Sequence, residues 1–387
     1  MIYFVTLILI IFPIYSIPFS FIGSIIDRKN RFIYLVELSI GLAFLAYCWK
    51  PNNIYDLYVW QNEAVKLSQM NYKQFIEYLS SNTELINLLV KYIVGKIGNV
   101  SLLQLFVVAS GYINIFYMLY DSCKEQQIKK MGYIITLIYI IVSLLYLNFI
   151  SGLFYTWAIT ILALGIYLYY FKKKKILPML LLIISILVHT SMIFPIIVFI
   201  MFVLSKSKIN YKSLIIILIL SVSPKVILPA LSKYTNIAIF NEINIMYNGY
   251  FLMDVYNKMN SGGLMVANLL MSIPIYLIYF VNHKKIDKLG NLSILLNIIT
   301  WLLYLTAPIF VRYIYLTVLL FMPSFENYFD SASDSMAQIN NKQIIFFIIC
   351  LIECILIFYQ IYLLKDIEIF KIIVDNSYKP ILFIFFN

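Results

Sequence analysis

The sequence predicts an all-α membrane protein, and three observations carry this prediction. Of its residues, 63% are hydrophobic and 12% are charged, whereas a soluble domain is about 45–50% apolar and about 25% charged. The apolar residues form long runs, and a run of about 18 or more is typical of a transmembrane helix. These runs exceed the roughly ten-residue alternating segments of a membrane barrel. We therefore expect a polytopic helical protein surrounded by the lipid bilayer, because helices satisfy every backbone group internally.

Short clusters of Lys and Arg between the apolar runs predict which loops share the cytoplasmic side. The net charge of +11 does not indicate a nucleic-acid partner, because the basic residues do not follow one amphipathic face. The clusters are Arg28, Lys29 and Arg31; Lys124, Lys129 and Lys130; Lys172 to Lys175; Lys206, Lys208 and Lys212; and Lys284, Lys285 and Lys288.

About ten transmembrane helices fit these clusters, with the N-terminus outside. The first run has no basic start and no small-residue cleavage site, so we expect it to be a retained span. The predicted helices cover residues 1–23, 32–49, 100–120, 132–150, 153–171, 213–230, 263–281, 290–307, 309–324 and 344–364. The whole chain, 1–387, is expected to form one multi-span domain with outer loops at 50–99 and 233–262. The segment from Phe325 to Lys342 is expected to be an inner loop.

The stretch from Ile176 to Leu204 breaks this pattern, since a basic cluster flanks it at each end. At about 1.5 Å per residue it is too short to cross a core of about 30 Å twice. We expect a short re-entrant hairpin of two helices that turns near His189, Thr190 and Ser191. Non-helical backbone at such depth is tolerated where it is buried in protein or lines a wet cavity. The turn is therefore a candidate site.

Two sparse basic side chains are catalytic candidates. Arg312 is the one arginine outside the first inner loop, and an arginine near the end of a span usually faces a partner or a water-filled cavity. Its planar fork binds phosphate or carboxylate through two hydrogen bonds; alternatively, it is an anchor that reaches the interface. His189 could accept a proton from a hydroxyl nucleophile. Equally, it could be a structural histidine bonded to the backbone.

The first outer loop supplies acidic and aromatic candidates in NNIYDLYVWQNEA. Asp56 and Glu63 lie seven residues apart, so on a helix they share one face and either could act as a base. Tyr55, Tyr58 and Trp60 could stack on sugars, or they could belong to the aromatic belt of the membrane interface. The amphipathic stretch TELINLLVKYIVGKIG that follows is expected to lie at the interface.

Several motifs are absent from the sequence. It contains no Asp-x-Asp pair, no His/Cys cluster at metal spacing, no Gly-rich phosphate loop and no Gly-x-Ser-x-Gly elbow. We therefore expect neither a metal nor a cofactor.

Together these segments resemble the EpsG-like, Wzy-type family of polysaccharide polymerases, which join lipid-linked oligosaccharide units at the outer leaflet. The resemblance rests on IYDLYVWQNEA with NTELINLLVKYIVGKIG, on LVHTSMIFPIIVF, on IFVRYIYL and on the ending DNSYKPILF. Two departures stand out. Tyr315 follows Arg312 by three positions instead of four. NFISGLFYTWAITI also lacks the arginine of the family's Asn-x-x-Arg-Gln-x-x-Ala segment.

The resemblance implies a glycosyltransferase of the bacterial inner membrane that uses polyprenyl-diphosphate-linked oligosaccharide as donor and acceptor. It implies that Arg312 stabilises the departing diphosphate, with His189, Asp56 or Glu63 as the base. A flippase and a chain-length regulator are the implied partner proteins, and the product would be a capsule, exopolysaccharide or O-antigen. The substrate-binding residues would be Tyr55, Tyr58, Trp60, Glu84, Tyr313 and Tyr315.

Two alternatives remain open. A flippase or other transporter also needs many spans, but transporters usually carry a matching pair of broken helices, and the sequence indicates one broken element. A membrane acyltransferase would use His189 as a base on an acyl donor, and would need that histidine to be accessible from the cytoplasm.

Overall fold

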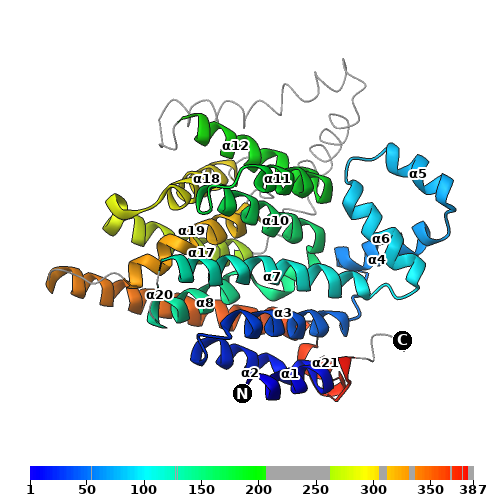
Figure 1. The fold of residues 1–387 in the computed structure, drawn as a ribbon, viewed down its shortest axis with the longest axis horizontal. Coiled ribbons are helices and arrows are strands. Elements are labelled where there is room, and N and C mark those ends of the chain that lie inside the picture. Colours follow the sequence, from blue (N-terminus) through cyan, green and yellow to red (C-terminus); the bar gives the residue numbers. More distant parts are fainter. Residues whose placement is uncertain are drawn as a thin grey trace.

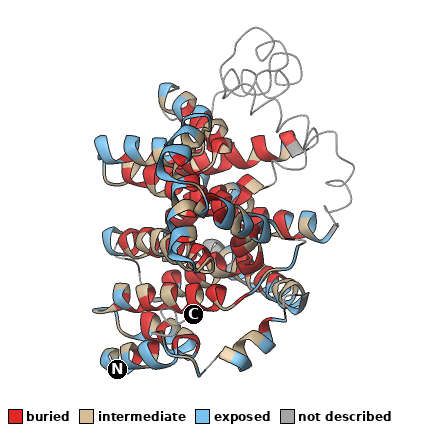
Figure 2. Cartoon of the chain, turned by 90° about the vertical axis from the view of Figure 1, so that its right-hand side faces the viewer, coloured by how far each residue is buried: buried red, intermediate tan, exposed pale blue. Residues whose placement is uncertain are grey.

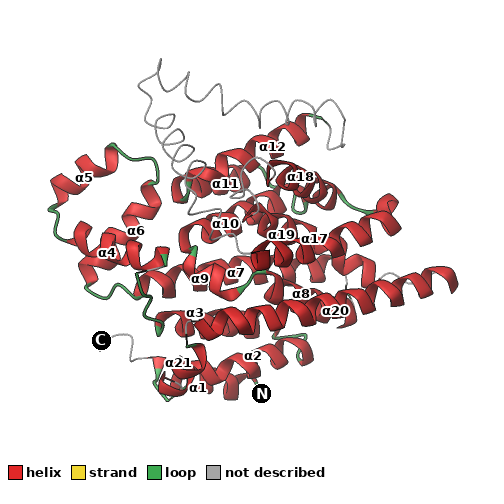
Figure 3. Cartoon of the chain, turned by 180° about the vertical axis from the view of Figure 1, so that it is seen from behind, coloured by secondary structure: helices red, strands yellow, loops and turns green. Residues whose placement is uncertain are grey.

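The computed structural model describes residues 1–53, 55–126, 128, 130–205, 262–304, 312–330, 336–366, 368–376 and 378–381. Every regular element in these ranges is a helix (Figure 3), so the all-α class is confirmed. The predicted span 213–230 lies outside the described residues, as does the outer loop 233–262 apart from Gly262.

The helices follow the chain in the order drawn in Figure 1. They are α1 (Ile2–Ile11), α2 (Pro13–Ile26), α3 (Arg31–Tyr47), α4 (Asp56–Ser68), α5 (Tyr72–Ser80), α6 (Leu85–Ile97), α7 (Leu102–Glu125), α8 (Lys130–Ser143), α9 (Tyr146–Ser151), α10 (Leu153–Tyr170), α11 (Ile176–Val188), η1 (Thr190–Met192), α12 (Ile193–Leu204), α17 (Gly262–Asn282), η2 (His283–Lys285), α18 (Lys288–Tyr304), α19 (Ile314–Asp330), α20 (Met336–Asp366) and α21 (Ile369–Asn376).

Four of the described helices, α7, α10, α17 and α20, are long and apolar enough to cross a membrane. Shorter apolar helices lie beside them. Large apolar side chains cover the outside of the bundle: Phe280 is 75% exposed and Phe347 is 70% exposed. Such exposure is expected in lipid, where an apolar surface faces acyl chains. These observations confirm a polytopic membrane protein.

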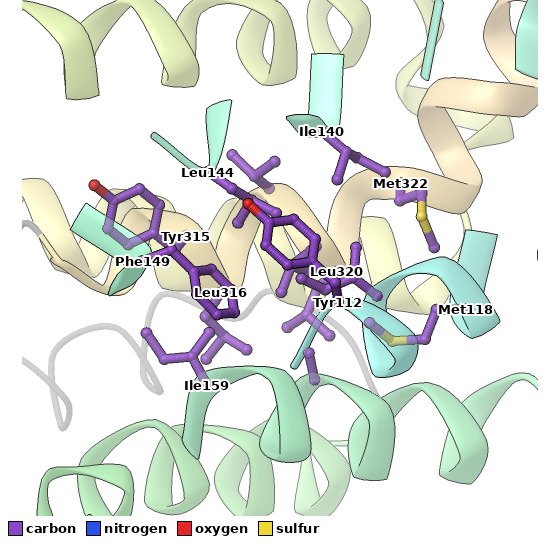
Figure 4. Close-up of a cluster of buried hydrophobic side chains, with 14 of the residues drawn as sticks. Tyr112, Met118, Ile140, Leu144, Phe149, Ile159, Tyr315, Leu316, Leu320 and Met322 are labelled. Atoms are coloured by element: carbon purple, nitrogen blue, oxygen red, sulfur yellow. The ribbon is translucent and has the colours of Figure 1, made fainter. Parts of the chain in front are cut away.

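Buried residues concentrate along the inner faces of the packed helices (Figure 2). Figure 4 shows part of this core, where α7, α9, α10 and α19 meet. The ring of Tyr112 stacks on Phe149 with centroids 4.7 Å apart. A Cβ atom at Gly111 would lie 2.6 Å from the Phe149 ring, so the small residue allows this close packing. The core thereby fixes α9 against the long helices.

The described loops that carry the basic clusters meet at one end of the bundle, as predicted, and we call this the inner end and the opposite one the outer end. The ammonium of Lys172 lies 2.9 Å from the carboxylate of Asp121 at the end of α7. The hydroxyl of Ser324, near the end of α19, donates to Asp287 just before α18 at 3.0 Å. The outer helices α4, α5 and α6 lie at the opposite end, on the right of Figure 1. The cluster at Lys206, Lys208 and Lys212 is outside the described residues.

Two charged residues at this inner end are more buried than the sequence indicates. Arg31 is 6% exposed, and its guanidinium lies 3.8 Å from the centroid of the Tyr133 ring. Glu326 is 0% exposed and accepts hydrogen bonds from Ser122 and Cys123. The prediction of an inner loop beginning at Phe325 was wrong, because α19 continues to Asp330.

The first predicted span, 1–23, is two helices and not one. The ring centroids of Phe4 and Phe19 are 6.1 Å apart, whereas a straight helix would separate these residues by about 22 Å. Helix α1 therefore folds back along α2, and Met1 returns toward the end where α2 finishes. The prediction of one continuous helix over residues 1–23 was wrong, and the side on which the N-terminus lies stays a prediction. Pro13 occupies the first position of α2, where its missing N–H and fixed φ favour a new helix start.

The fourth predicted span, 132–150, is also interrupted. Helix α8 ends at Ser143, and Leu145 adopts a left-handed φ of 37° before α9 begins. Gly152 then separates α9 from α10. The short helix α9 stands at the outer end of the bundle. Its polar residues Asn148 and Ser151 therefore lie among helix ends and not within a continuous span.

The hairpin is confirmed. Helix α11 has 13 residues and α12 has 12, which corresponds to about 20 Å and 18 Å. The turn between them begins at His189 and continues through η1. It lies at the outer end, because Tyr313 donates a hydrogen bond to the Ser191 carbonyl at 2.7 Å.

Candidate functional site

A cavity of about 90 Å³ lies at the outer end of the bundle, among α4, α9, α10, α17 and the start of α19. It brings together three predicted site residues from distant parts of the chain, Asp56, Arg312 and Tyr315. The lining residues are Asp56, Asn148, Ser151, Gly152, Tyr155, Thr156, Leu264, Asn268, Arg312 and Tyr315.

Arg312 lies two residues before α19 begins, and two tyrosines close to it in the sequence are anchored. Tyr313 donates to the Ser191 carbonyl in the hairpin turn. The Tyr315 hydroxyl accepts from the Asn148 amide at 2.8 Å. The Arg312 guanidinium carbon lies 5.7 Å from the centroid of the Tyr155 ring, within cation–π range. These contacts fix the backbone next to Arg312, whose side chain lines the cavity.

Asp56 is the first residue of α4, where a carboxylate is favoured by the helix dipole. It is exposed and lies at the cavity mouth. The helix is docked through Gln61, which donates to Gln104 of α7 at 2.8 Å. Gln104 in turn donates to the carbonyls of Ala46 and Trp49, both at 2.9 Å. A buried amide chain therefore positions Asp56.

Glu63 lies on the same helix, as predicted, but it is absent from the cavity lining. Its carboxylate pairs with Lys91 of α6 at 2.6 Å. The Lys91 side chain is 4% exposed and lies 4.9 Å from the Phe154 ring centroid. Burial lowers the pKa of the Lys91 ammonium, and the Glu63 charge opposes this shift. Glu63 is thus engaged in joining α4 to α6.

His189 contacts Tyr155, with ring centroids 5.4 Å apart, but it does not line the cavity. Its Nδ1 atom accepts the backbone N–H of Ser191 at 3.3 Å and lies 2.9 Å from the Ser191 hydroxyl. A ring nitrogen that accepts an N–H carries no proton, so the neutral ring is protonated on Nε2. Glu84 supports the same turn by accepting the Thr190 N–H at 3.1 Å. This geometry favours the structural interpretation of His189.

The aromatic candidates of the first outer loop are mainly packed against protein. The Tyr55 ring lies 5.1 Å from the Trp49 ring, edge to face. Trp60 makes a similar contact with Phe154 at 5.3 Å. Tyr58 is 40% exposed. Of these three candidates, Tyr58 has the surface most open to a ligand.

The cavity also contains polar residues that the sequence prediction missed. Tyr155, Asn148 and Ser151 come from NFISGLFYTWAITI, and Asn268 comes from α17. If the family's Asn-x-x-Arg segment is aligned on Asn148, Ser151 occupies the arginine position. A polar residue within a predicted span is by default a functional candidate. That signal was present, but neutral Asn and Ser side chains are weaker markers than a charge.

A model of the EpsG family matches residues 65–377 of the chain. The match includes the hairpin turn, α17 and Arg312, and it begins just after Glu63. No curated protein and no solved structure matches the chain.

Proposed function

The chain belongs to the EpsG family, and from this premise we propose that it polymerises polyprenyl-diphosphate-linked oligosaccharide units at the outer leaflet. Family membership suggests a polysaccharide polymerase-type function, and the substrate and the side of action are our proposal. The observation that carries it is a cavity that both Arg312 and Asp56 line. This glycosyl transfer needs a cation that binds the diphosphate and a carboxylate that accepts the proton of the attacking hydroxyl.

In the proposed reaction, the diphosphate leaves the first sugar of one unit as an acceptor hydroxyl from another unit attacks. The C1–O bond to the diphosphate breaks, and its electron pair leaves with the diphosphate. The acceptor oxygen bonds to C1, and its proton moves to the Asp56 carboxylate. Arg312 stabilises the charge that develops on the leaving diphosphate, an interaction that strengthens in the transition state. The base is Asp56 and not Glu63, because Glu63 is paired with Lys91.

The position of the cavity supports action at the outer leaflet. The basic loops gather at the opposite end of the bundle, and Lys and Arg in short loops favour the cytoplasmic side. His189, Glu84 and Tyr313 support the site indirectly. They fix the hairpin turn and hold it to the start of α19, which positions Arg312.

The test is Arg312→Ala in bacterial cells that depend on this chain for their polysaccharide. We expect the glycan ladder on a gel to collapse to one repeat unit, because the diphosphate loses its cation. Arg28→Ala, at an exposed position near the inner end, is the matched control and should leave the ladder unchanged.

An unaltered ladder in Arg312→Ala would discard the proposed role. The location of the accumulated unit provides a second readout. Units that accumulate on the outer leaflet support a polymerase, whereas units trapped on the inner leaflet indicate a transporter.

A further inference from the structure

We infer that the cavity selects a hydroxyl group on the sugar next to the diphosphate, through Tyr155 and Asn268. The inference rests on the proposed function, because it assumes that Arg312 holds the diphosphate. Neither residue belongs to the motifs that suggested the site.

The first observation is the hydroxyl of Tyr155. This residue is 7% exposed and lines the cavity. Its hydroxyl has no hydrogen-bond partner in the part of the chain that the structure describes. The neighbouring hydroxyls of Tyr313 and Tyr315 are both bonded, to Ser191 and Asn148. A buried hydroxyl without a partner is costly, so native proteins generally supply one.

The second observation is the side-chain carbonyl of Asn268, which is 1% exposed and lines the same cavity. Its amide nitrogen donates to the Leu264 carbonyl at 2.8 Å. This bond fixes the orientation of the amide, because a flipped side chain would turn its oxygen toward another acceptor. The Oδ1 atom is left without a partner among the described residues. The cavity thus holds one unused donor and one unused acceptor.

Polar groups elsewhere on the same helix are satisfied. Ser272, one turn beyond Asn268 on α17, belongs to a network centred on Asn297 of α18. Asn297 accepts from Tyr276 at 2.7 Å and donates to Thr317 at 2.9 Å and to Ser272 at 3.2 Å.

Buried atoms without a partner among the described residues also occur away from the cavity, for example Asn87 Oδ1 and Gln126 Oε1. Those of Tyr155 and Asn268 differ from them because both residues line the cavity. The two unpaired atoms at the cavity indicate that a ligand completes them.

The chemistry of the two atoms identifies the ligand group. A phosphate oxygen only accepts, so it would be repelled by the Asn268 oxygen. A hydroxyl donates and accepts, so it can bond to Asn268 and receive a bond from Tyr155. The cavity volume of about 90 Å³ exceeds the roughly 10–15 Å³ that one water molecule requires. The cavity therefore admits a few atoms of one sugar ring, while Arg312 holds the phosphate.

The experiment compares two lipid probes bound to the full chain in lipid nanodiscs. One is the lipid-linked unit that accumulates in producing cells lacking the chain, and the other is polyprenyl diphosphate without sugar. We expect Tyr155→Phe and Asn268→Leu each to weaken binding of the sugar-bearing probe about tenfold. Binding of polyprenyl diphosphate should stay unchanged, which also shows that each variant is folded. Arg312→Ala should weaken both probes.

Matched controls are Tyr276→Phe and Tyr146→Phe, which remove bonded hydroxyls away from the cavity. Both should keep the wild-type ratio of the two affinities. If Asn268→Leu does not fold, Asn268→Thr, which keeps an acceptor, should retain the preference for the sugar.

Two results would overturn the inference alone: variants that weaken both probes equally, or variants that weaken neither because water satisfies the two atoms. Failure of the proposed function looks different. In that case no lipid-linked unit accumulates, or Arg312→Ala binds polyprenyl diphosphate as well as the wild type does, and the inference falls with it.

Discussion

Replacing His189 by two different residues separates its structural interpretation from its catalytic one. Asparagine can accept the Ser191 N–H as the imidazole does, so His189→Asn should retain polymer synthesis. His189→Ala removes the cap, and loss of a cap costs about 0.5–2 kcal/mol. We expect a lower unfolding temperature for His189→Ala in detergent. A catalytic base would instead make both variants inactive at unchanged stability.

Asp56 is expected to matter more than Glu63 for the rate. Loss of a general base typically costs about 10²–10⁴-fold, so Asp56→Asn should slow polymer formation by at least about 100-fold. Glu63→Gln keeps the shape of the Lys91 partner and should change the rate little. The measurement is the initial rate at which membranes carrying each variant convert lipid-linked units into polymer. Equal losses in the two variants would contradict the assignment.

Only part of the candidate site could be predicted from the residue types in the sequence. Arg312 and Asp56 were recognisable because charges beside spans are few. The sequence could not show that Glu63 is paired with Lys91, since the two lie on different helices. It also could not show that Tyr155 and Asn268 face one cavity, because their side chains are neutral and their helices meet only in the folded bundle.

At the scale of elements, the crossing of α4 and α6 depends on Gly95. A Cβ atom there would lie 2.1 Å from the Ala64 carbonyl oxygen, so Gly95→Ala must push the helices apart. Overpacking of this kind costs about 1–3 kcal/mol. We expect a lower unfolding temperature and faster proteolysis of the outer helices. Ile97→Ala, at a 62% exposed position on the same helix, is the control and should change neither.

Hydropathy predicted the helices well, and their breaks poorly. A long apolar run has the same mean hydropathy whether its helix is straight or folded back. The turn between α1 and α2 was therefore missed despite Pro13. The interruption at Leu145 has no Gly or Pro beside it to mark it, and Leu145 adopts its left-handed φ at a fully buried position. The hairpin turn was predictable because a basic cluster at each end of Ile176 to Leu204 places both ends on one side. The stretch between them is too short to cross the membrane twice.

The arrangement of the whole molecule predicts which surfaces reach each side of the membrane. An impermeant maleimide should label Glu77→Cys on α5 in intact cells. Lys174→Cys, between α10 and α11, should react only after the membrane is permeabilised. Both positions are exposed, and the wild-type chain gives the background of its own cysteines. Labelling of Lys174→Cys in intact cells would reverse the orientation and remove the cavity from the outer leaflet.

The gathering of the basic loops at one end of the molecule was predictable, since it follows from counting charges between apolar runs, and the orientation of that end toward the cytoplasm stays a prediction. The depth and shape of the cavity were not predictable. They depend on where α4, α9, α17 and α19 end relative to one another, and a one-turn shift of any helix would move its lining residue by about 5.4 Å.

Helix α1, which folds back along α2, protects the side-chain carboxyl group of Glu37 on α3. Thr6 donates to Glu37 at 2.5 Å, and Glu37 is 3% exposed. Without α1, this acid would border the acyl chains, where a polar group has no bonding partner. The N-terminal helix therefore acts as a shield, which protects a hydrophilic spot on the bundle from the hydrocarbon around it.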